Sequence, residues 1–142
     1  MSENVVSELR FNDFAIDRMV FQKNHKFIAD KEEIGLDFAL SAEASISSEM
    51  DESIIVLNCK IYEDNFDEHN VPFYLDLSMR GYFNCSQDFN IEDFQFNGMA
   101  ILLPYLRSVI TSFTSQSGIS PVILPPINVY KVFKRSEDSL DN

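Results

Sequence analysis

The chain has 142 residues, 45% of them hydrophobic and 24% charged, which is the length of one domain and the composition of a globular protein. Its net charge of -12 excludes nucleic acid as an expected partner, because the phosphate backbone is also negative. No apolar run reaches the roughly 18 residues of a membrane-spanning helix, and the N-terminus lacks a signal-peptide pattern. We therefore expect a cytoplasmic protein without membrane insertion, whose two cysteines, Cys59 and Cys85, are reduced.

The first half of the chain predicts β-strands. Apolar and polar residues alternate with period two in the ranges 36–47, 54–62 and 71–83, which is typical of strands with one buried face. An earlier run, 14–21, changes phase near Asp17 and Arg18, which predicts a β-bulge. Because the four strands follow one another with short links, we expect a four-stranded antiparallel sheet.

After Asn90 the apolar residues recur at intervals of three and four, which predicts one long helix. Its expected N-cap is Asn97, and its expected C-terminal stop is Gly118. Pro104 lies inside this stretch and removes one backbone donor. The sequence therefore predicts either a kink at Pro104 or a helix that restarts with Pro104 in its first turn.

The helical stretch is followed by a segment with three prolines, Pro121, Pro125 and Pro126, which predict that residues 120–127 run extended. Asn128 is the expected N-cap of a short second helix over 129–134, and 136–142 has the composition of an acidic, disordered tail. The expected fold class is thus α+β, a four-stranded antiparallel sheet followed by one long and one short helix. A single domain is expected over residues 1–135.

The inventory of reactive side chains argues against an enzyme. His25 and His69 are the only histidines, and their spacing relative to the cysteines matches no zinc signature. The four glycines are scattered along the chain, so the sequence holds no phosphate-binding loop. We expect no catalytic residue, no metal site and no cofactor.

Apolar side chains are the abundant feature, with thirteen Phe and five Tyr. An apolar sheet face, a helix that is apolar on more than one side and an apolar extended segment exceed what one two-layer domain can bury. The surplus indicates burial in an oligomer, an exposed apolar groove, or both. The negative surface then either serves solubility alone or favours partners that are basic as well as apolar.

The range 100–133 resembles the signature of the bacterial protein-export chaperone SecB. The shared residues include Ile101-Leu102, Pro104-Tyr105 and Arg107, then Ile110-Thr111-Ser112, a glycine, and prolines around a short apolar run. Upstream, the range 34–38 resembles the start of the family's second strand. The range 73–83 resembles its fourth strand, with Asp76 and the ending Gly81-x-Phe83 in place.

The resemblance implies a homotetrameric chaperone, a dimer of dimers, that keeps precursor proteins unfolded in apolar grooves and passes them to the translocation motor SecA. The residues implied to line the client groove are Ile34, Leu36, Phe38, Phe73, Leu124 and Ile127. The surface facing SecA would include Tyr74 and Asp76. The residues implied in subunit contacts are Leu75, Leu77 and Met79.

The chain departs from the family pattern in two places. Around the first strand, where the family carries acids that contact SecA, this sequence has Arg18 and Gln22. The aromatic residue that the family places shortly before Ile34 is absent. Some SecB-like proteins serve instead as chaperones of an antitoxin within a toxin–antitoxin system, and this alternative function stays open.

Overall fold

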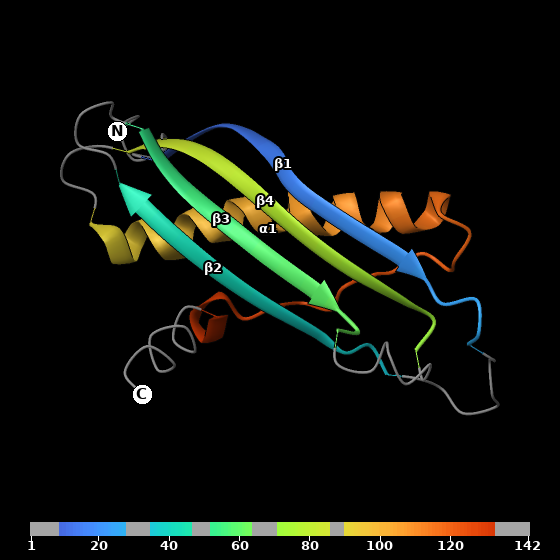
Figure 1. The fold of residues 1–142 in the computed structure, drawn as a ribbon. Helices are drawn as coiled ribbons and strands as arrows, with labels where there is room; N and C mark the ends of the chain where they lie inside the picture. The colour runs from blue at the N-terminus through green and yellow to red at the C-terminus, as the bar shows by residue number, and fades with distance from the viewer. Residues whose placement is uncertain (1–8, 28–34, 47–51, 64–70, 86–89, 133–142) are drawn as a thin grey trace.

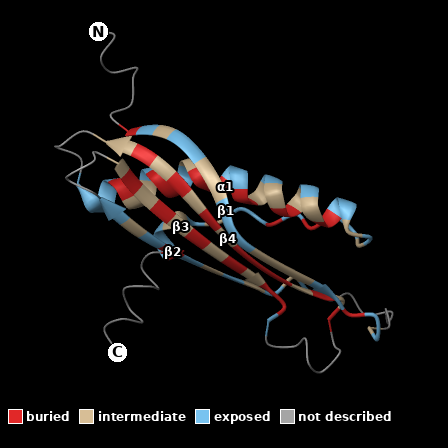
Figure 2. Cartoon of the chain, turned by 45° about the horizontal axis from the view of Figure 1, so that its top comes forward, coloured by how far each residue is buried: buried red, intermediate tan, exposed pale blue. Residues whose placement is uncertain are grey.

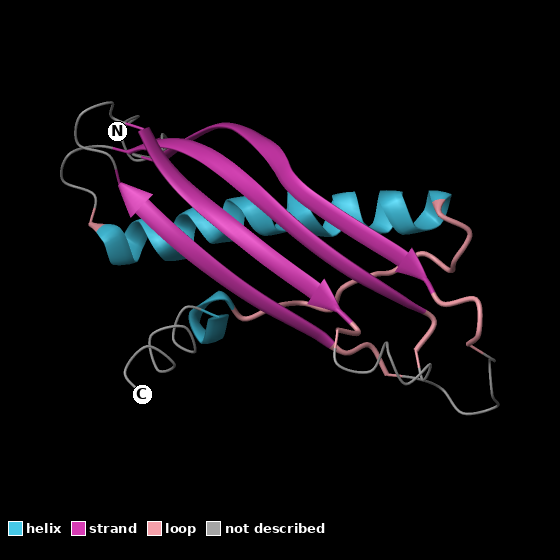
Figure 3. Ribbon diagram, viewed as in Figure 1, coloured by secondary structure: helices cyan, strands magenta, loops and turns pink. Residues whose placement is uncertain are grey.

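The computed structural model describes residues 9–27, 35–46, 52–63, 71–85 and 90–132. Within these ranges the elements are β1 (Leu9–Lys23), β2 (Phe38–Ile46), β3 (Glu52–Ile61), β4 (Phe73–Cys85) and α1 (Ile91–Gln116). The four strands form one antiparallel sheet in the order β1-β4-β3-β2. Residues 129–132 form a short helix after an extended segment (Figure 3). This architecture confirms the predicted fold class.

The strand β1 is longer and less regular than its sequence pattern predicts. Its pairing with β4 shifts register between Phe11 and Asp13 and again between Ile16 and Arg18. The second shift confirms the predicted bulge near Asp17 and Arg18. Each bulge inserts a residue into the period-two alternation, which explains why the alternation alone found only residues 14–21.

The helix α1 begins about two turns earlier than predicted, so the prediction that Asn97 is its N-cap is wrong. Asn90 caps the helix, since its side chain accepts a hydrogen bond of 2.8 Å from the amide of Asp93. Asn97 lies inside the helix and donates to the carbonyl of Asp93. Phe94 supplies the reason for the early start, because its ring packs edge-on against Phe83 of β4, with centroids 5.4 Å apart.

The other end of α1 follows the prediction. Gly118 has φ +86°, in the left-handed region that glycine adopts without strain, and it lies just beyond the C-cap Ser117. The helix continues through Pro104 without a restart, so that alternative is wrong. Pro104 is on the exposed side of α1, where water can satisfy the carbonyl that loses its donor.

The sheet and α1 form two layers with the core between them. The inner face of the two central strands is completely buried, at Ile55, Leu57, Cys59, Ile61, Leu75, Leu77, Met79 and Phe83. The side of α1 that covers it carries Phe94, Met99, Leu102, Leu106 and Ile110, also with 0% exposure. Figure 2 shows the resulting buried stripe along β3 and β4.

The opposite face of the sheet carries no described element, since α1 and the extended segment both lie on the inner side (Figure 1). The edge strands are β1 on one side and β2 on the other. Among the helices that the structure describes, α1 included, none is long and apolar enough to cross a membrane.

Candidate functional site

The extended segment after α1 is fixed to that helix by side-chain hydrogen bonds. Thr111 donates to the carbonyl of Val122 at 2.7 Å, and the amide of Val122 donates to the Thr114 hydroxyl at 2.9 Å. Further along, Arg107 Nη2 donates to the carbonyl of Leu124 at 3.1 Å. The segment therefore runs antiparallel to α1, in a fixed register.

Alternation along this segment divides its side chains between the core and the surface. Val122 and Leu124 are buried, whereas Ile123 between them is 73% exposed. Pro121, Pro125 and Pro126 have no backbone N–H, so the segment presents few donors that need partners. The segment is thus a mostly apolar strip, with Val122 and Leu124 in the core and Ile119 and Ile127 packed against it.

Three pockets follow this strip and have residues 119–132 as their common wall. We call them together the segment groove. The first pocket, of about 350 Å³, lies between residues 119–123 and the end of the sheet where β2 starts; it is lined by Leu36, Tyr62, Pro72, Phe73, Ile119, Ser120, Pro121, Val122 and Ile123. It brings together two residues predicted for the client groove, Leu36 and Phe73.

Tyr62 shapes this first pocket. Its ring meets Phe73 edge-on, with centroids 5.2 Å apart, and its hydroxyl donates to the carbonyl of Gly35 at 3.1 Å. Its φ of 62° turns the chain sharply after β3, a conformation that few non-glycine residues adopt. Burial, and secondarily the charge of Asp37, raises the pKa of the Tyr62 hydroxyl, so the hydroxyl stays a donor at neutral pH.

The second pocket, of about 330 Å³, lies between β2 and the short helix. It is lined by Phe38, Ala39, Leu40, Pro126, Ile127, Asn128, Lys131 and Val132. Two more predicted groove residues, Phe38 and Ile127, meet here. Asn128 caps the short helix as predicted, because its side chain accepts a hydrogen bond from the amide of Tyr130 at 3.1 Å.

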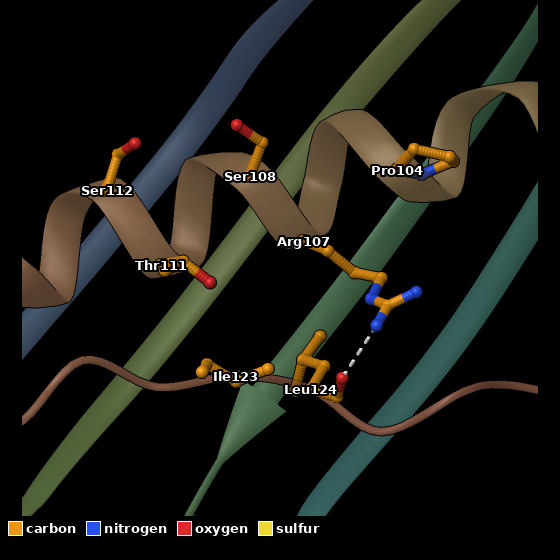
Figure 4. Close-up of a pocket in the computed structure, with 7 residues that line it drawn as sticks. All are labelled: Pro104, Arg107, Ser108, Thr111, Ser112, Ile123 and Leu124. Atoms are coloured by element: carbon orange, nitrogen blue, oxygen red, sulfur yellow. Dashed lines mark hydrogen bonds between the residues drawn. The ribbon is translucent and has the colours of Figure 1, made fainter.

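The third pocket, of about 390 Å³, separates α1 from the segment and is shown in Figure 4. It is lined by Pro104, Arg107, Ser108, Thr111, Ser112, Ile123 and Leu124. Arg107 and Thr111 point toward the segment, whereas Ser108 and Ser112 point away from it (Figure 4). Leu124, also predicted for the client groove, is almost fully buried and forms part of the pocket's inner wall.

The sequence analysis missed several residues of the groove, and Ile34, which it included, lies outside the described residues. The missed residues with the largest effect on its chemistry are Tyr62, Ile123, Arg107 and Lys131. Period-two alternation applied to the extended segment would have identified Ile123. The role of Arg107 as a donor to the segment depends on a contact 17 residues away, which no local pattern shows.

Tyr74 and Asp76, the residues implied to face SecA, lie on the uncovered face of the sheet. The Asp76 side chain is only 7% exposed and accepts from Arg18 Nη1 at 2.9 Å. The Tyr74 hydroxyl lies 3.5 Å from the same carboxylate, and burial together with Asp76 raises the pKa of Tyr74. The Asp76 carboxylate is thus engaged by Arg18, one of the residues at which the sequence departs from the SecB pattern.

Leu75, Leu77 and Met79, the residues implied in subunit contacts, have no exposed surface in the single chain. They belong to the inner face of β4 and pack in the intrachain core. In the single chain their side chains thus hold the sheet against α1, and their part in subunit contacts stays a prediction.

The described residues also show where the possible metal ligands and the two cysteine thiols lie. Within these ranges, no three His, Cys, Asp or Glu side chains gather in a way that could hold a metal ion. Burial, and secondarily Asp76, raises the pKa of the Cys59 thiol to about 12, which makes it a poor nucleophile at neutral pH. Cys85 lies 3.2 Å from the Ser53 hydroxyl.

Comparison with known proteins connects this geometry to a fold. No family model matches the chain. An uncharacterized protein of Methanocaldococcus jannaschii, MJ0357, is 28% identical over 134 residues, which cover 92% of this chain and 85% of that protein. The similarity to MJ0357 therefore supports shared ancestry, but it gives no indication of activity, because MJ0357 is itself uncharacterized.

Two solved structures resemble the fold. One is the SecB-like chaperone Rv1957 of Mycobacterium tuberculosis in complex with a ChAD peptide from the HigA1 antitoxin Rv1956, with a TM-score of 0.62, 14% identity and coverage of 84% of this chain and 88% of that one. The other is a protein of unknown function from Streptococcus agalactiae, with a TM-score of 0.52, 12% identity and coverage of 83% and 97%. The chain has a SecB-like fold.

Proposed function

We propose that this protein is a SecB-like chaperone that holds extended, unfolded segments of another polypeptide in the segment groove. The observation that carries this proposal is the row of pockets along residues 119–132, into which four of the predicted groove residues converge: Leu36 and Phe73 in the first, Phe38 and Ile127 in the second. The SecB-like fold supports it. The function needs no nucleophile and no cofactor, only apolar surface and room for an extended chain.

The reach of an extended client suits such a function. An extended segment of ten residues spans roughly 33 Å, so it can reach successive pockets along the strip. If it buries about 400 Å² of apolar surface, the gross gain is on the order of 10 kcal/mol. Much of this gain is offset by the entropy lost on ordering the client, so binding is moderate in strength and tolerant of sequence.

Two versions of this function differ in the partner. In the first, the clients are secreted precursors that are passed to SecA; in the second, the client is one dedicated protein such as an antitoxin. Two observations favour the dedicated version: the SecB-like neighbour is in complex with an antitoxin peptide, and the Asp76 carboxylate is already engaged by Arg18. We therefore place the dedicated partner first and preprotein export with SecA second.

Self-association as a dimer of dimers belongs to the same proposal. Ile16 on β1 is 47% exposed and Tyr105 on α1 is 40% exposed. The Tyr105 ring lies within 5.2 Å of Phe14 and 5.1 Å of Phe11, measured between centroids. This apolar surface along β1 and α1 is separate from the segment groove, so an assembly can bury the one and leave the other open. A cytoplasmic location would suit such a chaperone.

Light scattering during the aggregation of a reduced, unfolded test protein tests the function directly. The chaperone proposal expects that the chain suppresses scattering at near-stoichiometric ratios and forms a complex of increased mass. An unrelated acidic protein of similar charge serves as the control. Unchanged aggregation and no complex would contradict the proposal, and a calorimetric titration with SecA separates the two versions, since the dedicated version predicts no heat of binding.

A further inference from the structure

The segment groove has a charge pattern of its own. The third pocket has Arg107 in its lining and the second has Lys131, and these two are the charged side chains among the described residues that line the three pockets. Both are basic, in a chain with 23 acidic and 11 basic residues. We infer that the groove prefers extended apolar segments that carry acidic side chains, and this inference rests on the proposed function.

Arg107 is positioned to receive a carboxylate. One of its nitrogens, Nη2, donates to the carbonyl of Leu124, which fixes the guanidinium at the wall of the third pocket (Figure 4). A guanidinium carries five N–H donors, so it can serve a second acceptor on a bound chain. Arg107 is half-buried, and a charge-assisted hydrogen bond there is stronger than a neutral one.

Lys131 extends the basic character to the second pocket. It is exposed on the short helix and lines the wall opposite Phe38 and Leu40. Its aliphatic stem can lie along the apolar wall while the ammonium stays in water. A client with an apolar side chain between Phe38 and Ile127 therefore has a cation beside its neighbouring residues.

The lining of the first pocket differs in charge from that of the other two, so the two ends of the groove favour different client side chains. The described residues that line the first pocket carry no charge, and the charge of Asp37 contributes to the raised pKa of Tyr62, which is one of them. An acidic side chain is thus favoured toward the Leu124 to Lys131 end and disfavoured near Tyr62. The matching client places its apolar residues in the first pocket and its acidic residues toward the short helix.

This preference is opposite to the one expected from net charge alone. The overall charge of -12 predicts that basic clients are favoured, yet charges separated by more than about 8 Å are largely screened at physiological salt. The charges that touch the client therefore decide selectivity, whereas the net charge acts mainly on approach and solubility.

The test uses the full chain and synthetic peptides that share one apolar core, flanked by glutamates, by lysines or by glutamines. Fluorescence anisotropy at physiological salt measures each dissociation constant. We expect the glutamate peptide to bind about fivefold more tightly than the neutral glutamine peptide, because one close pair of opposite charges in water contributes about that factor. The lysine peptide should bind more weakly than either, because its charge is repelled by the basic lining. Equal binding, or tighter binding of the lysine peptide, would overturn the charge preference and leave the proposed function intact.

Variants locate the effect. Lys131→Glu removes the glutamate preference in the second pocket. Lys60→Glu is the control, because Lys60, whose side chain is 40% exposed and pairs with Glu63, lies on the uncovered face of the sheet. If the two variants change the glutamate-to-lysine ratio equally, the assignment to the groove is wrong. If no peptide binds, the glutamine peptide included, the proposed function itself fails and the charge preference fails with it.

Discussion

Leu36 lines the first pocket together with Phe73, where the described lining residues carry no charge. Leu36→Asp places a carboxylate where a client's apolar side chain would be buried, and burying a charge without a partner is unfavourable. We expect the variant to bind unfolded client at least about tenfold more weakly, equivalent to ~1.4 kcal/mol, measured by suppression of aggregation and by anisotropy.

The control for this substitution is Ser41→Asp. Ser41 is exposed on β2, and the alternation along that strand directs it to the uncovered face, so the same charge is added to the strand that follows Leu36, away from the groove. Circular dichroism should show that both variants are folded. If Leu36→Asp suppresses aggregation as well as Ser41→Asp does, Leu36 does not line the client site.

Cys59 gives a second prediction, on pH dependence. The unfolded thiol ionises near pH ~8.5, whereas burial holds the pKa of the folded thiol at about 12. As the pH rises between these values, the unfolded state loses its proton first, so the free energy of unfolding falls through this window. Cys59→Ala should flatten the decline, measured by urea denaturation at several pH values, and an unchanged slope would contradict the assignment.

Single residues also show how far the sequence predicts the site. Leu36, Phe38, Phe73 and Ile127 were predicted, because the resemblance to SecB implies groove positions at these residues. Tyr62 was not, since its place in the first pocket depends on a left-handed backbone turn after β3. A turn of that kind in a non-glycine residue has no signal in an apolar alternation.

At the scale of elements, the extended segment depends on Thr114. Its buried hydroxyl accepts from the amide of Val122 and donates to the carbonyl of Ile110 at 2.7 Å. Thr114→Val keeps the shape but leaves the Val122 amide unpaired and buried, at a cost of about 1–3 kcal/mol. We expect lower stability in chemical denaturation together with weaker client binding.

Ser115→Ala provides the matched control for Thr114→Val. The Ser115 hydroxyl is exposed and bonds only the carbonyl of Ser112 within its own helix, so its removal should change stability by less than about 0.5 kcal/mol. Equal effects of the two variants would show that the segment does not depend on the hydroxyl of Thr114.

Elements were easier to predict than their ends. Period-two alternation found β2, β3 and β4, and the intervals of three and four found α1, because each element buries one regular face. The start of α1 was placed too late, since Phe94 extends the buried stripe about one turn before Gly98. The tertiary contact of Phe94 with Phe83 decides this boundary, and the local sequence does not contain it.

At the scale of the whole molecule, the exposed apolar surface along β1 and α1 predicts assembly. Ile16→Gln adds a polar group at a position that is 47% exposed in the single chain, so it should weaken subunit contact while the fold is retained. We expect sedimentation velocity to show a shift from the proposed tetramer toward smaller species.

Ile46→Gln is the control for this assembly prediction. Ile46 is also an exposed isoleucine, but it lies on β2, the opposite edge of the sheet from β1. If Ile46→Gln dissociates the assembly and Ile16→Gln does not, the interface is on the other side of the molecule.

Methyl NMR of the full chain, titrated with an unfolded polypeptide, tests the central claim most directly. The account predicts that the methyl signals of Leu36, Ile123 and Ile127, which line the segment groove, shift on binding. The methyls of Ile54 and Val56, which alternate onto the uncovered face of β3, should stay in place. Shifts confined to Ile54 and Val56, or no shifts at all, would contradict a chaperone that holds its client along residues 119–132.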